Sequence, residues 1–318
     1  MTNTEPMSDS ERGFGTGVLP PDGAAQPMPL PVTAVETVVT AALAEDSPWG
    51  DLTSHALVPE AADVTAFLTA REEGFFCGEQ ILEAAFRLAG PGTSVMCLVR
   101  DGERFDAGGI LAEVSGPARS VLTGERVALN LVQRLSGIAT QTARFVAQAA
   151  GTRARIADTR KTTPGLRALE RYAVRCGGGF NHRYSLSDAV MAKDNHLAVI
   201  AAAGMDLATA LRQAKDRLPH TVHFEVEVDS LDQIEPVLAG GADTVLLDNF
   251  SIEDLRRGVA VVNGRALVEA SGNVRLDTVA AIADTGVDII SAGALTHSVR
   301  ALDLGLDIRA AVPQAQPR

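Results

Sequence analysis

Basic side chains are concentrated in one part of an otherwise acidic chain. The 318 residues carry a formal net charge of −12, yet residues 151–196 contain nine lysines and arginines against four acids. A nucleic-acid surface would need a basic balance overall, so this segregation predicts a pocket for a small anion and no nucleic-acid partner. A solvated basic helix face would place its charges at helical spacing, whereas these lie in loops or at strand ends of one predicted β-α-β unit. The members at such ends are Arg160, Lys161, His182, Arg183 and Lys193.

Acidic side chains end the next two predicted strands. Glu225 and Glu227 are two positions apart in H-F-E-V-E-V-D, so they point to the same side of a strand, about 7 Å apart. Asp248 and Asn249 end the following strand, T-V-L-L-D-N. Carboxylates on neighbouring strand ends are hard oxygen ligands that suit Mg²⁺ bound to a phosphorylated substrate. A structural ion pair with the basic cluster is the alternative, and it is strongest for Glu225.

Glycine-containing turns follow the last two predicted strands. Ser271-Gly272-Asn273 and the turn around Gly293 come after apolar strands and before predicted helices. Backbone N–H groups at such places bind phosphate, although glycine also serves ordinary turns. The chain therefore offers one half-site for a carboxylated acceptor and another for Mg²⁺ and phosphates. Both would be used if a carboxylated acceptor were joined to a phosphorylated sugar donor.

Alternating strands and helices predict the scaffold from residue 155 onward. Repeated β-α units imply parallel strands with right-handed crossovers, and six of them predict a barrel that is not fully closed, with its active site at the carboxyl ends of the strands. The predicted strands are 155–158, 189–193, 222–228, 244–248, 266–270 and 287–292, and the predicted helices are 165–176, 205–217, 231–239, 252–262 and 276–284.

The N-terminal half predicts a separate α/β domain. Periodic apolar residues predict a helix from Val32 to about Asp46, and short apolar runs predict strands at 64–70, 94–100 and 110–114. A helix at 125–135 would carry Arg126 as a solvated arginine, and Ser136 to Thr140 would form a hinge before another helix at 140–150. We therefore predict an α/β fold with an N-terminal α/β sandwich domain followed by an open (incomplete) parallel α/β barrel. The predicted divisions are a disordered Pro/Gly-rich tail (1–31), the sandwich (32–138), the barrel with the active site (139–300) and a C-terminal segment that packs back on the N-terminal domain (301–318).

Composition narrows the class of protein further. No apolar run approaches the roughly 20 residues that a membrane span needs, so no membrane partner is expected. The acidic N-terminus lacks the pattern of a secretory signal or a transit peptide, which predicts a cytoplasmic location. Cys77, Cys97 and Cys176 are odd in number and form no C-x-x-C pair, so free thiols in a reducing compartment are expected.

Several long motifs, in order from about residue 32 to the C-terminus, resemble one enzyme family. They are E-D-S-P-W-G-D-L-T-S, L-N-L-V-Q-R-L-S-G-I-A-T, D-T-R-K-T-T-P-G-L-R, G-G-G-F-N-H-R, A-K-D-N-H, E-V-E-V-D-S, L-L-D-N-F, E-A-S-G-N and S-A-G-A-L-T-H-S. The sequence resembles quinolinate phosphoribosyltransferase, also called carboxylating nicotinate-nucleotide pyrophosphorylase. The resemblance implies that quinolinate and phosphoribosyl pyrophosphate are converted to nicotinate mononucleotide, pyrophosphate and CO₂ in de novo NAD synthesis. It also implies a homodimer or a higher oligomer such as a hexamer.

The resemblance implies a role for each matching position. Arg160, His182, Arg183 and Lys193 would hold the two quinolinate carboxylates; Lys161 would lie between quinolinate and the donor; Glu227 and Asp248 would face the ribose and, through Mg²⁺, the pyrophosphate; Asn249, Ser271, Gly272 and Gly293 would line the phosphate region. Lys161, Glu227 and Asp248 are the catalytic candidates. Arg126 would reach the neighbouring subunit's site, which replaces its interpretation as a solvated arginine. Asn273 departs from the family, where a second glycine is common.

Three other functions stay open at this point. A paralogue of the same fold could act on nicotinate or be linked to molybdate uptake, and activity with nicotinate but not quinolinate would identify it. A Schiff-base aldolase could use Lys193, which also ends a barrel strand, and borohydride trapping would detect it. A non-enzymatic anion-binding protein would have no need of acidic strand ends.

Overall fold

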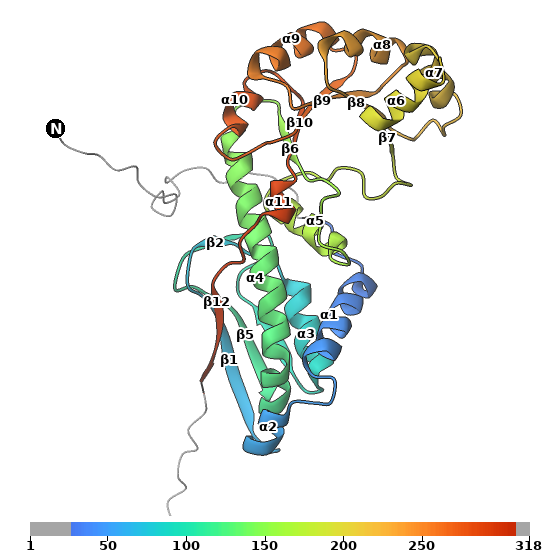
Figure 1. Ribbon diagram of the computed structural model, residues 1–318. Coiled ribbons are helices and arrows are strands. Elements are labelled where there is room, and N and C mark those ends of the chain that lie inside the picture. The colour runs from blue at the N-terminus through green and yellow to red at the C-terminus, as the bar shows by residue number, and fades with distance from the viewer. Residues whose placement is uncertain (1–26, 310–318) are drawn as a thin grey trace, which may run out of the picture.

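A computed structural model describes residues 27–309, so the predicted disordered tail lies outside the described residues up to position 26, as does 310–318. The N-terminal half combines helices with an antiparallel sheet (Figure 1). Its elements are α1 (Val32–Asp46), α2 (Leu52–Leu57), β1 (Asp63–Ala70), β2 (Gly74–Phe75), α3 (Glu79–Ala89), β3 (Ser94–Cys97), β4 (Arg104–Phe105) and β5 (Ile110–Pro117). The helices α2 and α3 were not predicted from the sequence.

The N-terminal sheet is completed by the end of the described chain. Its strand order is β12-β1-β5-β3, and β12 (Leu304–Arg309) pairs antiparallel with β1, with Leu304 opposite Ala70. In Figure 1 the chain descends from the barrel to lie beside β1. The segment after the barrel therefore belongs to the sheet of the N-terminal domain.

One long helix, α4 (Ala118–Gln148), runs through both halves of the molecule (Figure 1). Its 31 residues form a helix about 45 Å long, so the predicted hinge at 136–140 is wrong. Ser136 and Gly137 serve close packing instead. The Ser136 hydroxyl accepts a hydrogen bond from the Cys77 backbone N–H at 3.1 Å, and a side chain at Gly137 would overlap the carbonyl oxygen of Arg300.

The C-terminal half is a six-stranded parallel sheet in the order β6-β11-β10-β9-β8-β7. Its first and last strands, β6 and β7, do not pair with each other, which confirms the prediction of an open barrel. The helix α6 starts directly after Lys193 and was not predicted. The elements are β6 (Arg155–Ala157), α5 (Arg167–Cys176), β7 (Val190–Ala192), α6 (Asp194–Ala202), α7 (Leu207–Lys215), β8 (Phe224–Val228), the 3₁₀ turn Leu231–Gln233, α8 (Ile234–Ala239), β9 (Thr244–Asp248), α9 (Ile252–Val262), β10 (Leu267–Ser271), α10 (Val279–Ala283), β11 (Ile289–Ser291) and α11 (Ala294–His297).

The barrel strands are short apolar runs that end in polar residues. In β9, four consecutive buried residues precede the half-buried Asp248, as expected for a parallel strand covered on both faces. The helix α9 then starts at a capped position, because the Ser251 hydroxyl accepts the Asp254 backbone N–H at 3.1 Å. Over residues 27–309, only the bent pair α6 and α7 has the length and hydropathy to cross a bilayer, and no single helix does.

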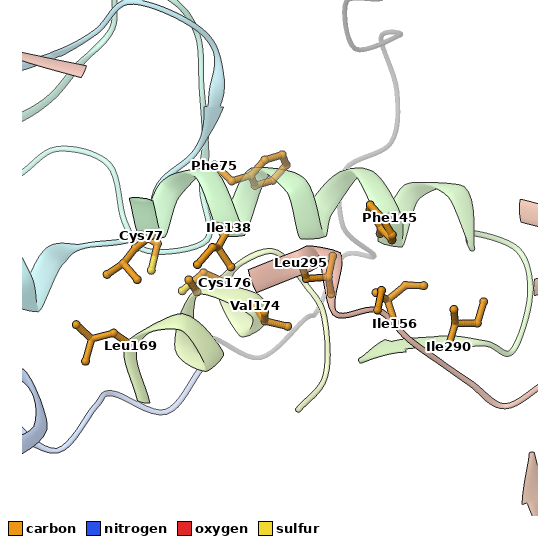
Figure 2. Packing of buried hydrophobic residues seen from close by; sticks show 14 of the residues in the cluster. Phe75, Cys77, Ile138, Phe145, Ile156, Leu169, Val174, Cys176, Ile290 and Leu295 are labelled. Atoms are coloured by element: carbon orange, nitrogen blue, oxygen red, sulfur yellow. The ribbon is translucent and has the colours of Figure 1, made fainter. Parts of the chain in front are cut away.

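A continuous apolar core joins the two halves along α4. Figure 2 shows Ile138 and Phe145 of this helix facing α5, β6 and α11, from which Val174, Ile156 and Leu295 come. All three cysteines are free, and Cys77 and Cys176 are buried. The active-site loops that follow β6 and β11 are thus attached to the same rigid helix that supports the N-terminal sheet.

Candidate active site

Two arginines at the mouth of the barrel form no ion pair with any acid among residues 27–309. Arg160 lies in the loop after β6 and Arg183 in the loop before β7, and the Nε atom of each is buried without a hydrogen bond. Burial, followed by the nearby charge of Arg160, lowers the pKa of Arg183. Within residues 27–309, the Arg183 guanidinium makes one hydrogen bond, from Nη1 to the Ala189 carbonyl at 2.9 Å. Two adjacent cations with unused donors form a binding place for an anion with more than one charge.

A buried clamp fixes the loop that contains Arg183. The carboxylate of Asp158 is fully buried and accepts hydrogen bonds from the His182 N–H at 2.7 Å and from Asn181 Nδ2 at 2.6 Å. Arg171 pairs with this carboxylate at 3.3 Å and donates to the His182 carbonyl at 2.6 Å. Burial raises the pKa of Asp158, and the charge of Arg171 opposes that rise. The function of Arg171 was missed from the sequence, because nothing local in the sequence pairs it with Asp158.

The side chain of His182 points at two acids in the barrel interior. Its Nε2 lies 3.1 Å from a Glu225 oxygen and 3.6 Å from a Glu269 oxygen, and its Nδ1 accepts the Arg183 backbone N–H at 2.8 Å. Burial opposes a charged imidazole, but the hydrogen bond to Glu225 and the charge of Glu269 raise the pKa of His182 overall. Burial, and then the charge of Glu225, raises the pKa of Glu269 to about 8. Both ring nitrogens therefore have protein partners, and the structural alternative weighed for Glu225 is what the structure shows.

The other acids line a hollow. Glu227 at the end of β8 and Asp248 at the end of β9 border one cavity of about 530 Å³, whose apolar wall includes Leu197 and Met205. Lys193, the residue after β7, forms an ion pair with Glu227. Lys193 therefore joins the predicted cationic group to the acids, although none of the predicted cations lines this cavity.

The ends of β9 and β10 are tied together around Gly272. Asn249 donates its backbone N–H to the Ser271 carbonyl at 2.9 Å, and a side chain at Gly272 would overlap Asn249 Oδ1. Gly272 has φ +87°, and Asn273 follows with φ +48°. Asparagine is one of the few residues that tolerate this left-handed conformation, so Asn273 can occupy the turn. The next helix begins only at Val279, so this turn is not the helix start that the sequence predicted.

Lys161 lies against the loop that contains Gly293. A Cβ atom on Gly293 would be 3.0 Å from Lys161 Cδ and 2.8 Å from His297 Nε2. The Thr296 hydroxyl donates a hydrogen bond to the Lys161 carbonyl at 2.7 Å. His297 was not predicted as a site residue. The sequence feature that could have indicated it is the spacing of four residues from Gly293, because one helical turn brings His297 back over the glycine.

Arg126 stands apart from these groups. It is exposed on α4, and its guanidinium makes no hydrogen bond or ion pair with any residue of the described part of the chain. Within one chain it is a solvated arginine, as its position on the helix indicates. It is available to a second molecule.

Comparison with known proteins identifies the family of the chain. The family model described as the quinolinate phosphoribosyl transferase C-terminal domain matches residues 138–307, and that of the N-terminal domain matches residues 51–136. The chain is similar to a probable carboxylating nicotinate-nucleotide pyrophosphorylase of Bacillus subtilis, with 42% identity over 83% of this chain and 90% of the relative. It is 44% identical to the corresponding protein of Mycobacterium leprae over 86% of this chain and 97% of the relative.

Solved structures give the same result. The nicotinate-nucleotide pyrophosphorylase of Francisella tularensis superposes with a TM-score of 0.83 at 39% identity, covering 89% of this chain and 99% of its own. The two family models adjoin within α4, where the sheet domain meets the barrel. These matches span most of the chain and include both halves of the site described above. The chain belongs to the quinolinate phosphoribosyltransferase family.

Proposed function

We propose that this protein transfers a phosphoribosyl group from phosphoribosyl pyrophosphate to quinolinate and removes one carboxylate, producing nicotinate mononucleotide, pyrophosphate and CO₂. Family membership supports this reaction class, and the relatives' names specify the carboxylating pyrophosphorylase. The observation that carries the substrate assignment is the pair of arginines, Arg160 and Arg183, each with a buried Nε atom that has no hydrogen-bond partner in the described part of the chain. A dicarboxylate would satisfy donors that a monocarboxylate would leave unused.

Orientation would supply most of the rate enhancement in the first step. The pyridine nitrogen is already a nucleophile, so it can attack the ribose C1 atom without a general base while the bond to pyrophosphate breaks. Positive charge develops on the ribose, and Glu227 and Asp248, which border the hollow, can stabilise it electrostatically. Lys161 would lie between the two substrates, and Arg160 and Arg183 would fix the acceptor ring.

Decarboxylation follows from the charge on the ribosylated ring. The bond between the ring carbon next to nitrogen and its carboxylate breaks, CO₂ leaves, and the electron pair stays on that carbon beside the positive nitrogen. A proton from solvent then binds to this carbon at the position that the carboxylate occupied. No organic cofactor is needed for this step.

The residues present fit a magnesium ion that arrives with the donor. Glu227 and Asp248 offer carboxylate oxygens on adjacent strand ends and line the same cavity. Mg²⁺ prefers few protein carboxylates together with substrate phosphates, where it neutralises the charge of the leaving pyrophosphate. The backbone around Asn249, Ser271, Gly272 and Gly293 would line the phosphates.

We also propose a homodimer in which Arg126 reaches the partner's site. The unpaired, exposed guanidinium on a rigid helix supports this assignment. The three free cysteines fit the cytoplasmic location expected from the sequence. The dimer is tested by mixing two inactive variants, Arg126→Ala and one substituted at Asp248. Activity in the mixture requires that each site contain residues of both chains, and a mixture that stays inactive contradicts the shared site.

The reaction is tested by incubating the purified protein with quinolinate, phosphoribosyl pyrophosphate and Mg²⁺ and measuring CO₂, pyrophosphate and nicotinate mononucleotide. We expect all three products in equal amounts and none after chelation of Mg²⁺. A parallel reaction contains nicotinate in place of quinolinate. Turnover of nicotinate alone would replace this proposal with the paralogous activity. A Schiff-base aldolase would need an unpaired amine at Lys193, whereas that group pairs with Glu227.

A further inference from the structure

An ion pair between a half-buried arginine and a completely buried carboxylate lies behind the loops that contain Lys161 and Gly293. Glu170 in α5 is completely buried, and Arg134 of α4 donates to one of its oxygens from Nε at 2.9 Å and from Nη2 at 2.5 Å. Removing the Glu170 charge from water is costly, so the pair is weak support for stability. Its fixed, forked geometry indicates a positioning function instead.

The same pair is bonded to both loops. The second oxygen of Glu170 accepts the Thr163 backbone N–H at 3.1 Å, and Arg134 Nη2 donates to the Thr163 hydroxyl at 2.7 Å. The same Nη2 donates to the Thr296 carbonyl at 3.0 Å. Thr163 follows Lys161 by two residues, and Thr296 follows Gly293 by three. One guanidinium therefore anchors the loop after β6 and the loop after β11.

Thr296 also connects this hydrogen-bond network to Lys161 itself. This threonine is completely buried, and its hydroxyl donates to the carbonyl of Lys161 at 2.7 Å. The backbone of the predicted catalytic lysine is thus fixed by a residue that Arg134 fixes in turn. Arg134 belongs to α4, which continues as a helix through its Ser136-Gly137 step, so the network is attached to this helix.

We propose that Arg134, Glu170 and Thr296 are positioning residues for phosphoribosyl transfer. They set the separation of the Lys161 and Gly293 loops, between which the donor would be held. None of the three borders the cavity between Glu227 and Asp248. This inference rests on the proposed function. A displacement of about 1 Å in such loops is enough to lower catalysis by roughly a hundredfold.

The sharpest variants alter the Thr296 hydroxyl. Thr296→Val removes the bond to Lys161 with little change of shape, and we expect kcat to fall about tenfold or more because the loop shifts. Thr296→Ser keeps the hydroxyl and should restore kcat to within about twofold. Because Arg160 lies in the same loop as Lys161, the dissociation constant of quinolinate should rise in Thr296→Val, and in Thr296→Ser it should stay within about threefold of the wild type.

Glu170→Gln tests the ion pair, and we expect it to lower kcat by roughly a hundredfold. The matched control is Glu235→Gln, which breaks a two-bond pair with Arg265 on the exposed surface and should leave kcat within about twofold. If Glu170→Gln does not fold, the two Thr296 variants decide. Thr296→Val with wild-type kcat, or equal losses in Thr296→Val and Thr296→Ser, would overturn the proposal.

Hydrogen exchange separates this inference from the proposed reaction. In Thr296→Val, the amides of 159–163 and 293–297 should exchange faster than in the wild type, while those of 181–183 should not. A wild-type protein inactive on quinolinate would refute the proposed function, and the exchange result would then judge the positioning network alone. Unchanged exchange in both loops would refute the network.

Discussion

The two sides of the barrel mouth differ in how their charges are satisfied. On the cationic side, Arg160 and Arg183 each retain a buried Nε without a partner. On the acidic side, Glu227 is paired with Lys193, and Asp248 accepts a hydrogen bond from Asn249 Nδ2 at 2.7 Å. A ligand on the first side gains interactions without losing any, whereas a ligand on the second must replace existing ones. Replacing a side chain should therefore lower activity most on the cationic side.

Replacing Arg183 gives the largest expected effect. Arg183→Ala removes charge-assisted hydrogen bonds to the acceptor and should lower kcat/KM for quinolinate roughly a hundredfold to a thousandfold. Steady-state kinetics at saturating donor measure this loss. Arg257→Ala on the exposed face of α9 is the control and should behave as wild type. A loss of less than about tenfold would remove Arg183 from the site.

On the acidic side, Asp248→Asn should mainly lower kcat, by about a hundredfold, because the missing charge acts in the transition state. Calorimetric binding of quinolinate without donor should stay within about threefold of wild type. If quinolinate affinity collapses instead, the acidic side contributes to acceptor binding and the division between the two sides is incorrect.

The acids in the barrel interior can be tested through the titration of Glu269. Its pKa is raised from an ordinary value of 4.5 to about 8, so the folded protein retains a proton that the unfolded chain releases. The free energy of unfolding should therefore fall as the pH rises from about 4.5 to about 8, by at most about 1.4 kcal/mol per pH unit. Glu269→Gln should lose less over that range. Thermal melting of both proteins from pH 5 to 9 measures the difference, and parallel curves would show that Glu269 is not the group responsible.

A substitution at Gly272 tests whether the turn after β10 contributes to donor binding. Gly272→Ala places a methyl group onto Asn249 at a left-handed backbone position, which should cost about 1–3 kcal/mol of stability. The KM for the donor should rise, while quinolinate binding should not change. Denaturant unfolding and kinetics measure the two effects, and an unchanged KM for the donor would remove this turn from the donor site.

The smallest effect is expected at the next residue. Asn273→Gly accepts the same backbone conformation but loses a hydrogen bond of 3.0 Å to Asn249, so stability should fall by about 1 kcal/mol or less. The KM for the donor should stay within about twofold. A large increase would mean that the asparagine side chain itself contacts the donor.

Local patterns predicted most of the fold. The helix α9 was predicted at its observed residues, 252–262, and all six barrel strands were found. The errors occurred where tertiary contacts override local signals. Gly137 was predicted to lie in a hinge, but it lies within α4, where the Arg300 carbonyl packs against it and leaves no room for a side chain.

The site was predictable only as far as charge and strand ends reveal it. The separation of cations from acids singled out Arg160, Arg183 and Asp248 as candidates without coordinates. The partners that orient them could not be found, because Arg134 meets Glu170 from 36 positions away through packing of α4 on α5. The same limit applies to His182, whose acidic neighbours come from two other strands.

The pairing of β12 with β1 has a consequence for synthesis of the protein on the ribosome. Until residues 304–309 emerge, β1 presents a bare sheet edge, although every other strand of its sheet has already been translated. Exposed edges of this kind invite pairing with other nascent chains. The sheet of the N-terminal domain is therefore completed only at the end of translation. A chain that terminates after the barrel would keep an unpaired β1 edge and would be prone to aggregate.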